Sequence, residues 1–216
     1  MPNQGVRTVD AAGMVSPMLA FATAVLLMLI TPGPGVLSAA AVGAGFGLRA
    51  GASYVTGLFL GNMATALIVA SGLWSLLATL PHLRLVLGVL SLGYLLYLAW
   101  RVATANAEIG FGAADRAPRL GSGITLQLLN PKAYAVNTVI FSNFPLYPES
   151  WPVEVAIKIV LFNAVWIPVH IVWMQVGVTL KRLELSTRTQ RAINVAMALS
   201  LVGVVIIALF ELRTGS

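Results

Sequence analysis

Asn130, Pro131 and Lys132 are the residues whose types and spacing point most directly to chemistry. They stand inside an apolar run that includes L-Q-L-L-N-P-K-A, residues 126–133. Asparagine followed by proline fits the cap and the first position of a helix, so a break and a restart are predicted here. Lys132 stands deep in this run, and a lysine in hydrocarbon costs at least about 2.5 kcal/mol. We therefore expect its ammonium group to face a polar cavity and to bind an anion such as a carboxylate.

A second break is predicted where an earlier apolar run reads T-P-G-P-G. The motif comprises Thr31, Pro32, Gly33, Pro34 and Gly35. Thr31 and Pro32 fit a helix cap and a first helical position. The prolines leave carbonyl groups one turn earlier without donors, which favours a cation, and the N–H groups of the restarting helix favour an anion. Because a zwitterion carries both charges, this break is predicted to suit a zwitterionic ligand.

Each of these motifs also has a simpler structural interpretation. A proline kink in a membrane helix can be stabilised by neighbouring helices without any ligand. Lys132 can extend its four-carbon chain toward the membrane interface. The acidic residues of the chain all lie in predicted loops or near the ends of apolar runs, so none is predicted to pair with Lys132 inside the membrane. They are Asp10, Glu108, Asp115, Glu149, Glu154, Glu184 and Glu211.

Further polar side chains lie in the apolar runs and are candidates for a transport pathway or for ion coupling. They are Asn62, Gln127, Tyr134, Asn137, Asn163 and His170. Such residues can line a hydrated path, or they can hydrogen-bond between helices and serve only to hold them together. His170 is the candidate for a proton relay, and its alternative role is that of a neutral side chain bonded to a carbonyl.

The composition indicates that these motifs belong to an integral membrane protein. Of the 216 residues, 58% are hydrophobic and only 9% are charged, and the mean hydropathy is +0.89. A soluble domain carries roughly 25% charged residues. The net charge of +6 could indicate nucleic acid, but the basic residues lie mainly between apolar runs, which is typical of a protein oriented in a membrane. No nucleic-acid partner is therefore expected.

Six apolar runs are long enough to cross about 30 Å of hydrocarbon. They cover residues 17–40, 51–78, 83–103, 122–145, 152–179 and 191–212. We expect an N-terminal segment at 1–16, a first three-helix repeat at 17–103, a cytoplasmic linker at 104–121, a second repeat at 122–212 and a tail at 213–216. The fold class predicted is an all-α integral membrane protein with six transmembrane helices, of which the first and fourth are broken.

The distribution of basic residues predicts the orientation. The connections after the first, third and fifth runs hold Arg49, Arg101, Arg116, Arg119, Lys181, Arg182, Arg188 and Arg191, against Arg7, Arg84, Lys158 and Arg213 on the other side. Since basic loops stay in the cytoplasm, both termini are predicted to be extracytoplasmic. Two halves of three spans then run in opposite directions, as in an inverted repeat. The equivalent spacings from Pro32 to Asn62 and from Pro131 to Asn163 support this interpretation.

Catalytic, metal and cofactor sites are not predicted. The chain has no cysteine, no H-E-x-x-H, no G-x-S-x-G and no Walker A motif. The pair Gly57 and Gly61 has the small-xxx-small spacing that serves helix contacts in membranes. We therefore expect a transporter and not an enzyme.

Over nearly its whole length the chain resembles the LysE/RhtB family of small bacterial amino-acid exporters. The resemblance rests on T-P-G-P-G at 31–35, G-L-R-A-G at 47–51, G-Y-L-L-Y-L-A-W-R at 93–101 and L-L-N-P-K-A at 128–133. It implies six spans in two inverted halves in the bacterial inner membrane. It also implies export of amino acids or related metabolites driven by ion or proton gradients, with the proline motifs at 31–35 and 130–132.

One residue departs from the family pattern. Asn62 stands in the second span where many members carry an ionisable residue, and an amide cannot carry a proton. A cationic substrate side chain would also need an opposite charge in the cavity. We therefore expect a neutral amino acid or a derivative. The alternative functions are a passive channel for small zwitterions and a non-catalytic membrane assembly protein. A homo-oligomer is compatible with the sequence.

Overall fold

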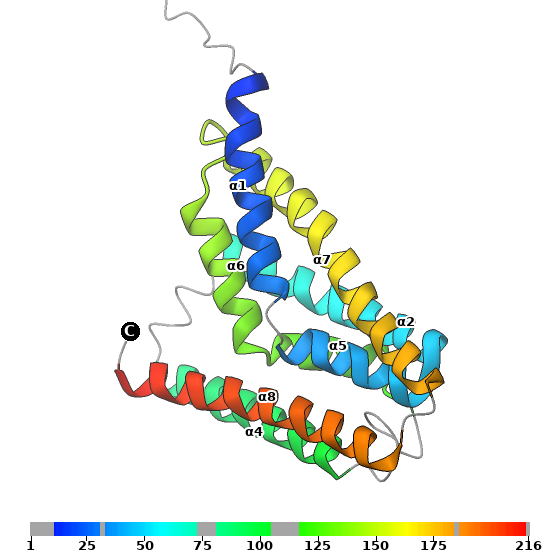
Figure 1. Cartoon of the computed structure of the whole chain (residues 1–216). Helices are drawn as coiled ribbons and strands as arrows, with labels where there is room; N and C mark the ends of the chain where they lie inside the picture. Colours follow the sequence, from blue (N-terminus) through cyan, green and yellow to red (C-terminus); the bar gives the residue numbers. More distant parts are fainter. Residues whose placement is uncertain (1–10, 31–32, 73–80, 105–116, 184–185, 215–216) are drawn as a thin grey trace, which may run out of the picture.

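The computed structural model describes residues 11–30, 33–72, 81–104, 117–183 and 186–214 (Figure 1). The regular structure in these ranges is helical, without a strand. The helices are α1 (Ala11–Ile30), α2 (Pro34–Ala70), α4 (Pro81–Ala103), α5 (Leu120–Leu128), α6 (Pro131–Asn143), α7 (Trp151–Arg182) and α8 (Thr187–Thr214). This all-helical architecture agrees with a membrane protein.

Most helices follow the apolar runs closely. Helices α4, α7 and α8 each cover a predicted span, and the predicted fourth span is divided into α5 and α6. Helix α1 begins at Ala11, six residues before the predicted first span, so the predicted N-terminal segment at 1–16 is partly helical. Residues 1–10, most of the predicted linker and the end of the predicted second span lie outside the described residues.

Helix α2 crosses the predicted boundary between the first two spans, at 41–50, as two helical segments joined at a single residue, Gly47. The helix continues from Pro34 to Phe46 and bends at Gly47, whose φ of 79° and ψ of −174° are non-helical. A Cβ built on Gly51 would lie 3.6 Å from the Cα of Gly43, although residues eight apart in a straight helix are about 12 Å apart. The two segments therefore meet at a sharp bend (Figure 1), which glycine permits because it lacks a Cβ.

The first segment of α2 forms the centre of the molecule. Every residue from Pro34 to Ala44 is buried, and α2 packs against α5 and α7. Glycines allow these close contacts. A Cβ on Gly57 would overlap the carbonyl of Leu120 in α5, and a Cβ on Gly61 would lie 2.9 Å from the carbonyl oxygen of Ile124. The expected role of Gly57 and Gly61 in helix contacts is confirmed.

Replacing Gly177 by alanine is expected to destabilise the protein through the contact between α7 and α2. A Cβ on Gly177 would overlap the carbonyl oxygen of Ala40, and overpacking of this kind costs about 1–3 kcal/mol. Gly203→Ala in α8 is the matched control, since its Cβ would meet nothing within 4 Å and alanine favours a helix by about 1 kcal/mol. Thermal unfolding of the purified variants in detergent measures the difference. Equal midpoints for the two variants would contradict this contact.

Two helices have the length and hydropathy of membrane spans among the described residues. They are Pro34–Ala70 and Trp151–Leu180, and Val15–Ile30 is a shorter apolar helix. Helix α1 packs against α6 and α7, whereas α4 and α8 form a pair at one side of the bundle (Figure 1). Large apolar side chains such as Val160 and Leu199 are exposed, as expected for surfaces in contact with lipid.

Candidate functional site

Helix α6 begins as its sequence predicts. Asn130 is extended, with φ of −83° and ψ of 106°, and Pro131 follows in the first turn. The Oδ1 atom of Asn130 accepts a hydrogen bond of 3.1 Å from the backbone N–H of Lys132. The break therefore arises from local chemistry, because a capping amide is followed by a proline that needs no donor.

Helix α2 begins two residues later than predicted. Gly33 is the cap residue, with φ of −151° and ψ of 178°, and Pro34 takes the first turn. The prediction that Thr31 caps and Pro32 starts this helix is therefore wrong, since the second proline of the motif serves as the start. Thr31 and Pro32 themselves lie outside the described residues. The N–H groups that follow Pro34 belong to Gly35 and Val36, and Gly33 makes no side-chain cap.

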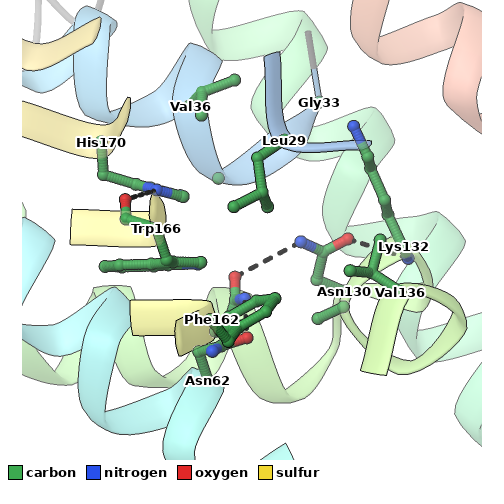
Figure 2. Close-up of a pocket in the computed structure, with 13 residues that line it drawn as sticks. Leu29, Gly33, Val36, Asn62, Asn130, Lys132, Val136, Phe162, Trp166 and His170 are labelled. Atoms are coloured by element: carbon green, nitrogen blue, oxygen red, sulfur yellow. Dashed lines mark hydrogen bonds between the residues drawn. The ribbon is translucent and has the colours of Figure 1, made fainter. Parts of the chain in front are cut away.

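The two helix starts line one pocket (Figure 2). It has about 370 Å³ of empty space, including its open mouth. Its lining comes from both starts, from the middle of α2 and from α7. The lining residues are Leu29, Gly33, Gly35, Val36, Asn62, Gln127, Asn130, Lys132, Ala133, Val136, Phe162, Trp166 and His170.

Lys132 joins the start of α6 to the start of α2. A Cβ built on Gly33 would lie 2.9 Å from Cδ and 3.1 Å from Nζ of Lys132, so the lysine chain occupies the space that glycine leaves open. Figure 2 shows Lys132 and Gly33 on one side of the pocket and His170 on the opposite side. The ammonium group therefore adds positive charge beside a helix N-terminus, which already favours anions.

Buried amides form one wall of this pocket and link three helices. Asn130 donates to Oε1 of Gln127 over 3.3 Å, and Gln127 donates to Oδ1 of Asn62 over 3.1 Å. The same Oδ1 accepts a bond of 3.4 Å from Asn137. These side chains are all 4% exposed or less. The amides thus bind α5 and α6 to α2 while three of them line the pocket.

His170 faces the start of α2 with one ring nitrogen. Its Nδ1 lies 2.9 Å from the carbonyl oxygen of Trp166, and a carbonyl only accepts, so Nδ1 carries the hydrogen. In the neutral ring Nε2 is then an acceptor. This atom lies 3.2 Å from a Cβ built on Gly35, and the imidazole stacks on the Trp166 ring with centroids 3.6 Å apart. Gly35 therefore leaves room for an acceptor nitrogen at the pocket.

Sequence reasoning missed the aromatic residues of the pocket, Phe162 and Trp166. Both belong to a buried row at four-residue spacing along α7, which places them on one face of the helix. The row consists of Glu154, Lys158, Phe162, Trp166, His170, Met174 and Val178. This spacing could have revealed them, but the surrounding residues of α7 are almost all apolar and obscure it.

Three predicted pathway residues do not line the pocket. Tyr134 is half-buried on α6, and Asn137 reaches the pocket only through its bond to Asn62. Asn163 donates to the carbonyl of Ile159 over 2.8 Å. The other candidates, Asn62, Gln127 and His170, lie in the lining together with four residues of the two predicted motifs.

A buried ion pair lies on α7 away from the pocket. Nζ of Lys158 lies 2.8 Å from Oε1 of Glu154, and both side chains are 5% exposed or less. Lys158 also donates to the carbonyl of Phe141 in the last turn of α6. Glu154 accepts from the backbone N–H groups of Leu146 and Tyr147. The sequence prediction counted Lys158 among the surface charges that report orientation. Lys158 is buried instead.

The chain is similar in sequence to curated efflux proteins. Three curated relatives are named cysteine/O-acetylserine efflux protein. The one from Klebsiella pneumoniae subsp. pneumoniae is 29% identical over 166 residues, which cover 77% of this chain and 84% of the relative. The one from Salmonella choleraesuis is 27% identical over 87% of this chain and 96% of the relative. The one from Escherichia coli O1:K1 / APEC is 26% identical over 85% and 92%.

No solved structure matches the chain significantly. The family model described as LysE type translocator matches residues 26–211, which include both helix breaks and every residue of the pocket. The chain therefore belongs to the LysE type translocator family, whose efflux proteins are multi-pass transporters of the inner membrane and not enzymes.

Proposed function

We propose that the protein exports a small neutral amino acid or a close derivative from the cytoplasm as a secondary transporter. The observation that carries this proposal is the meeting of two helix starts and Lys132 in one pocket. A site near the middle of a membrane transporter, formed by interrupted helices, is the usual arrangement for small charged substrates. The names of the curated relatives support export of an amino acid.

The substrate carboxylate binds between Lys132 and the first turn of α2. Gly35 and Val36 belong to the lining, and their N–H groups lie in the first turn of α2, at the positive end of the helix dipole. Gly33 has no side chain, which lets Lys132 approach the same end. Together these groups supply a charged donor and two backbone donors for an anion.

The substrate ammonium group binds on the opposite side of the pocket. Nε2 of His170 is an acceptor in the neutral ring, and it lies beside Gly35. Phe162 and Trp166 belong to the same lining, and an aromatic ring attracts a cation over its face by about 0.5–2 kcal/mol. Both charged groups of the zwitterion are thereby bound.

A neutral side chain fits the pocket better than a charged one. None of the described lining residues is acidic, so a lysine or arginine substrate would bring an uncompensated charge into a site of low dielectric. The curated relatives are named for cysteine and O-acetylserine, both small and neutral in their side chains. This likeness supports the same substrate class here.

Two inverted halves are the arrangement we propose for the membrane. Helix α2 packs on α7 and α4 packs on α8, so the second and third helices of each half pair with their equivalents, as a pseudo-two-fold axis requires. Both termini are extracytoplasmic in this proposal. A reporter fused after Ser216 should then be active only outside the cytoplasm, and cytoplasmic activity would overturn this orientation.

Counterflow into proteoliposomes tests the proposed function. Vesicles loaded with an unlabelled neutral amino acid should accumulate the labelled compound transiently and with saturation, whereas lysine, arginine and glutamate should compete poorly. Flux that never saturates and shows no counterflow would favour a passive facilitator. Absence of flux for every amino acid in protein that is folded would contradict export.

A further inference from the structure

We propose that Asn62 forms a subsite that binds a hydrogen-bond acceptor on the side chain of the substrate. This inference rests on the proposed function and adds to it a chemical class of side chain. It follows from the direction of the hydrogen bonds in the amide wall. That direction is fixed at two points by backbone groups whose roles are certain.

The first fixed point is the start of α6. The backbone N–H of Lys132 can only donate, so the atom of Asn130 that it contacts must be the oxygen. Asn130 therefore donates a hydrogen bond from its nitrogen, and the atom of Gln127 that accepts it must be the oxygen. The nitrogen of Gln127 then donates a hydrogen bond to Asn62.

The second fixed point lies one turn further along α6. The carbonyl oxygen of Ala133 can only accept, and it lies 2.8 Å from the side chain of Asn137. The nearby atom of Asn137 is therefore its nitrogen, and this nitrogen also contacts Asn62. Two independent routes thus require that Asn62 presents its oxygen to the amide wall.

The nitrogen of Asn62 consequently points away from the wall. Among the described residues it has no hydrogen-bond partner, although Asn62 lines the pocket and is 1% exposed. Buried donors without a partner are rare and costly in folded proteins. Rotating the amide does not relieve this, because Nδ2 would then face the donor nitrogens of Gln127 and Asn137.

A donor in this position selects among neutral substrates. A side chain with an ether, ester, carbonyl or hydroxyl oxygen can accept from Nδ2 of Asn62, whereas a hydrocarbon of the same shape leaves the donor unpaired. A metal cation or an ammonium group is disfavoured for the same reason, since it meets a donor and not an acceptor. Sites built around a buried donor discriminate strongly against analogues that lack the matching group.

The Asn62 subsite can be tested on the wild-type protein, without any substitution. O-methylserine and norvaline have side chains of nearly the same shape, and they differ by one ether oxygen in place of a methylene group. Both are compared as competitors of labelled serine in the counterflow assay. We expect O-methylserine to compete about tenfold more strongly, because the missing acceptor costs an unpaired buried donor. Equal competition with intact serine counterflow would overturn the subsite and leave amino-acid export standing.

Two variants separate selection from a structural role. Asn62→Leu should abolish the preference, so that O-methylserine and norvaline compete about equally. Asn163→Leu is the matched control, because Asn163 also lies between α2 and α7, with a bond to Met63, but outside the lining, and it should keep the wild-type preference. If Asn62→Leu lowers transport of both compounds equally, Asn62 is only structural. If it does not fold, the wild-type comparison decides alone. A wild-type protein without serine counterflow would overturn the proposed function as well.

Discussion

Lys132→Gln is expected to raise the substrate concentration for half-maximal counterflow by about 10- to 150-fold. A hydrogen bond to a charged group contributes about 1.5–3 kcal/mol, and this range converts to that loss of affinity. Glutamine keeps a donor of similar length but removes the positive charge beside the start of α2. The protein should remain folded, because Lys132 is only half-buried and the cap of α6 uses its backbone N–H and not its side chain.

Two controls separate this effect from a general loss of charge. Arg119→Gln removes a positive charge from the exposed residue before α5, and it should leave the affinity unchanged. Gly33→Ala keeps the lysine but places a methyl group 2.9 Å from its Cδ, so it should weaken binding by a smaller factor. Wild-type affinity in Lys132→Gln would remove Lys132 from the carboxylate site and support the interpretation of a lysine that extends toward the interface.

The start of α6 could be predicted from sequence because its cause is local. Asn130 and Pro131 are adjacent, and each favours the same helix boundary by its own chemistry. The start of α2 was predicted two residues early because T-P-G-P-G offers two prolines that fit equally well. The choice depends on whether Gly33 or Thr31 precedes the first turn, and the extended backbone of Gly33 decides it.

The bend in α2 could not be predicted for a different reason. Residues 43–47 contain three glycines in G-A-G-F-G, and the sequence does not say which of them leaves the helix. Only Gly47 has a positive φ, whereas Gly43 stays helical and lets Met174 of α7 approach its Cα. The contact with a helix about 130 residues away thus determines the role of each glycine.

The row on α7 shows how tertiary contacts hide a simple pattern. Its members recur every fourth residue, but charged, aromatic and sulfur-containing side chains follow one another, so no single residue type marks it. Phe162, Trp166 and His170 line the pocket, and Lys158 and Glu154 precede Phe162 by about one and two turns. Which members line the pocket and which form the ion pair depends on where α6 packs, and the sequence of α7 alone does not show that.

Breaking the buried pair of Glu154 and Lys158 is expected to cause the largest loss of stability. Removing one partner of such a pair costs about 3–5 kcal/mol, because it leaves a buried charge uncompensated. The two single variants should differ. Glu154→Gln leaves the ammonium of Lys158 with the carbonyl of Phe141 as its hydrogen-bond acceptor. Lys158→Met leaves a carboxylate that still accepts from the backbone of Leu146 and Tyr147, so it should cost less.

The double variant Glu154→Gln with Lys158→Met is expected to recover most of the loss, since neither charge is then buried. Unfolding in mixed detergent gives the free energies for a double-mutant cycle, which isolates the coupling between the two side chains. Neither residue lines the pocket, so the folded fraction of each variant should transport with wild-type affinity. Additive losses in the cycle would show that the two side chains stabilise the protein independently. The connection between α6 and α7 would then be held by the backbone bonds of Glu154 and not by the ion pair.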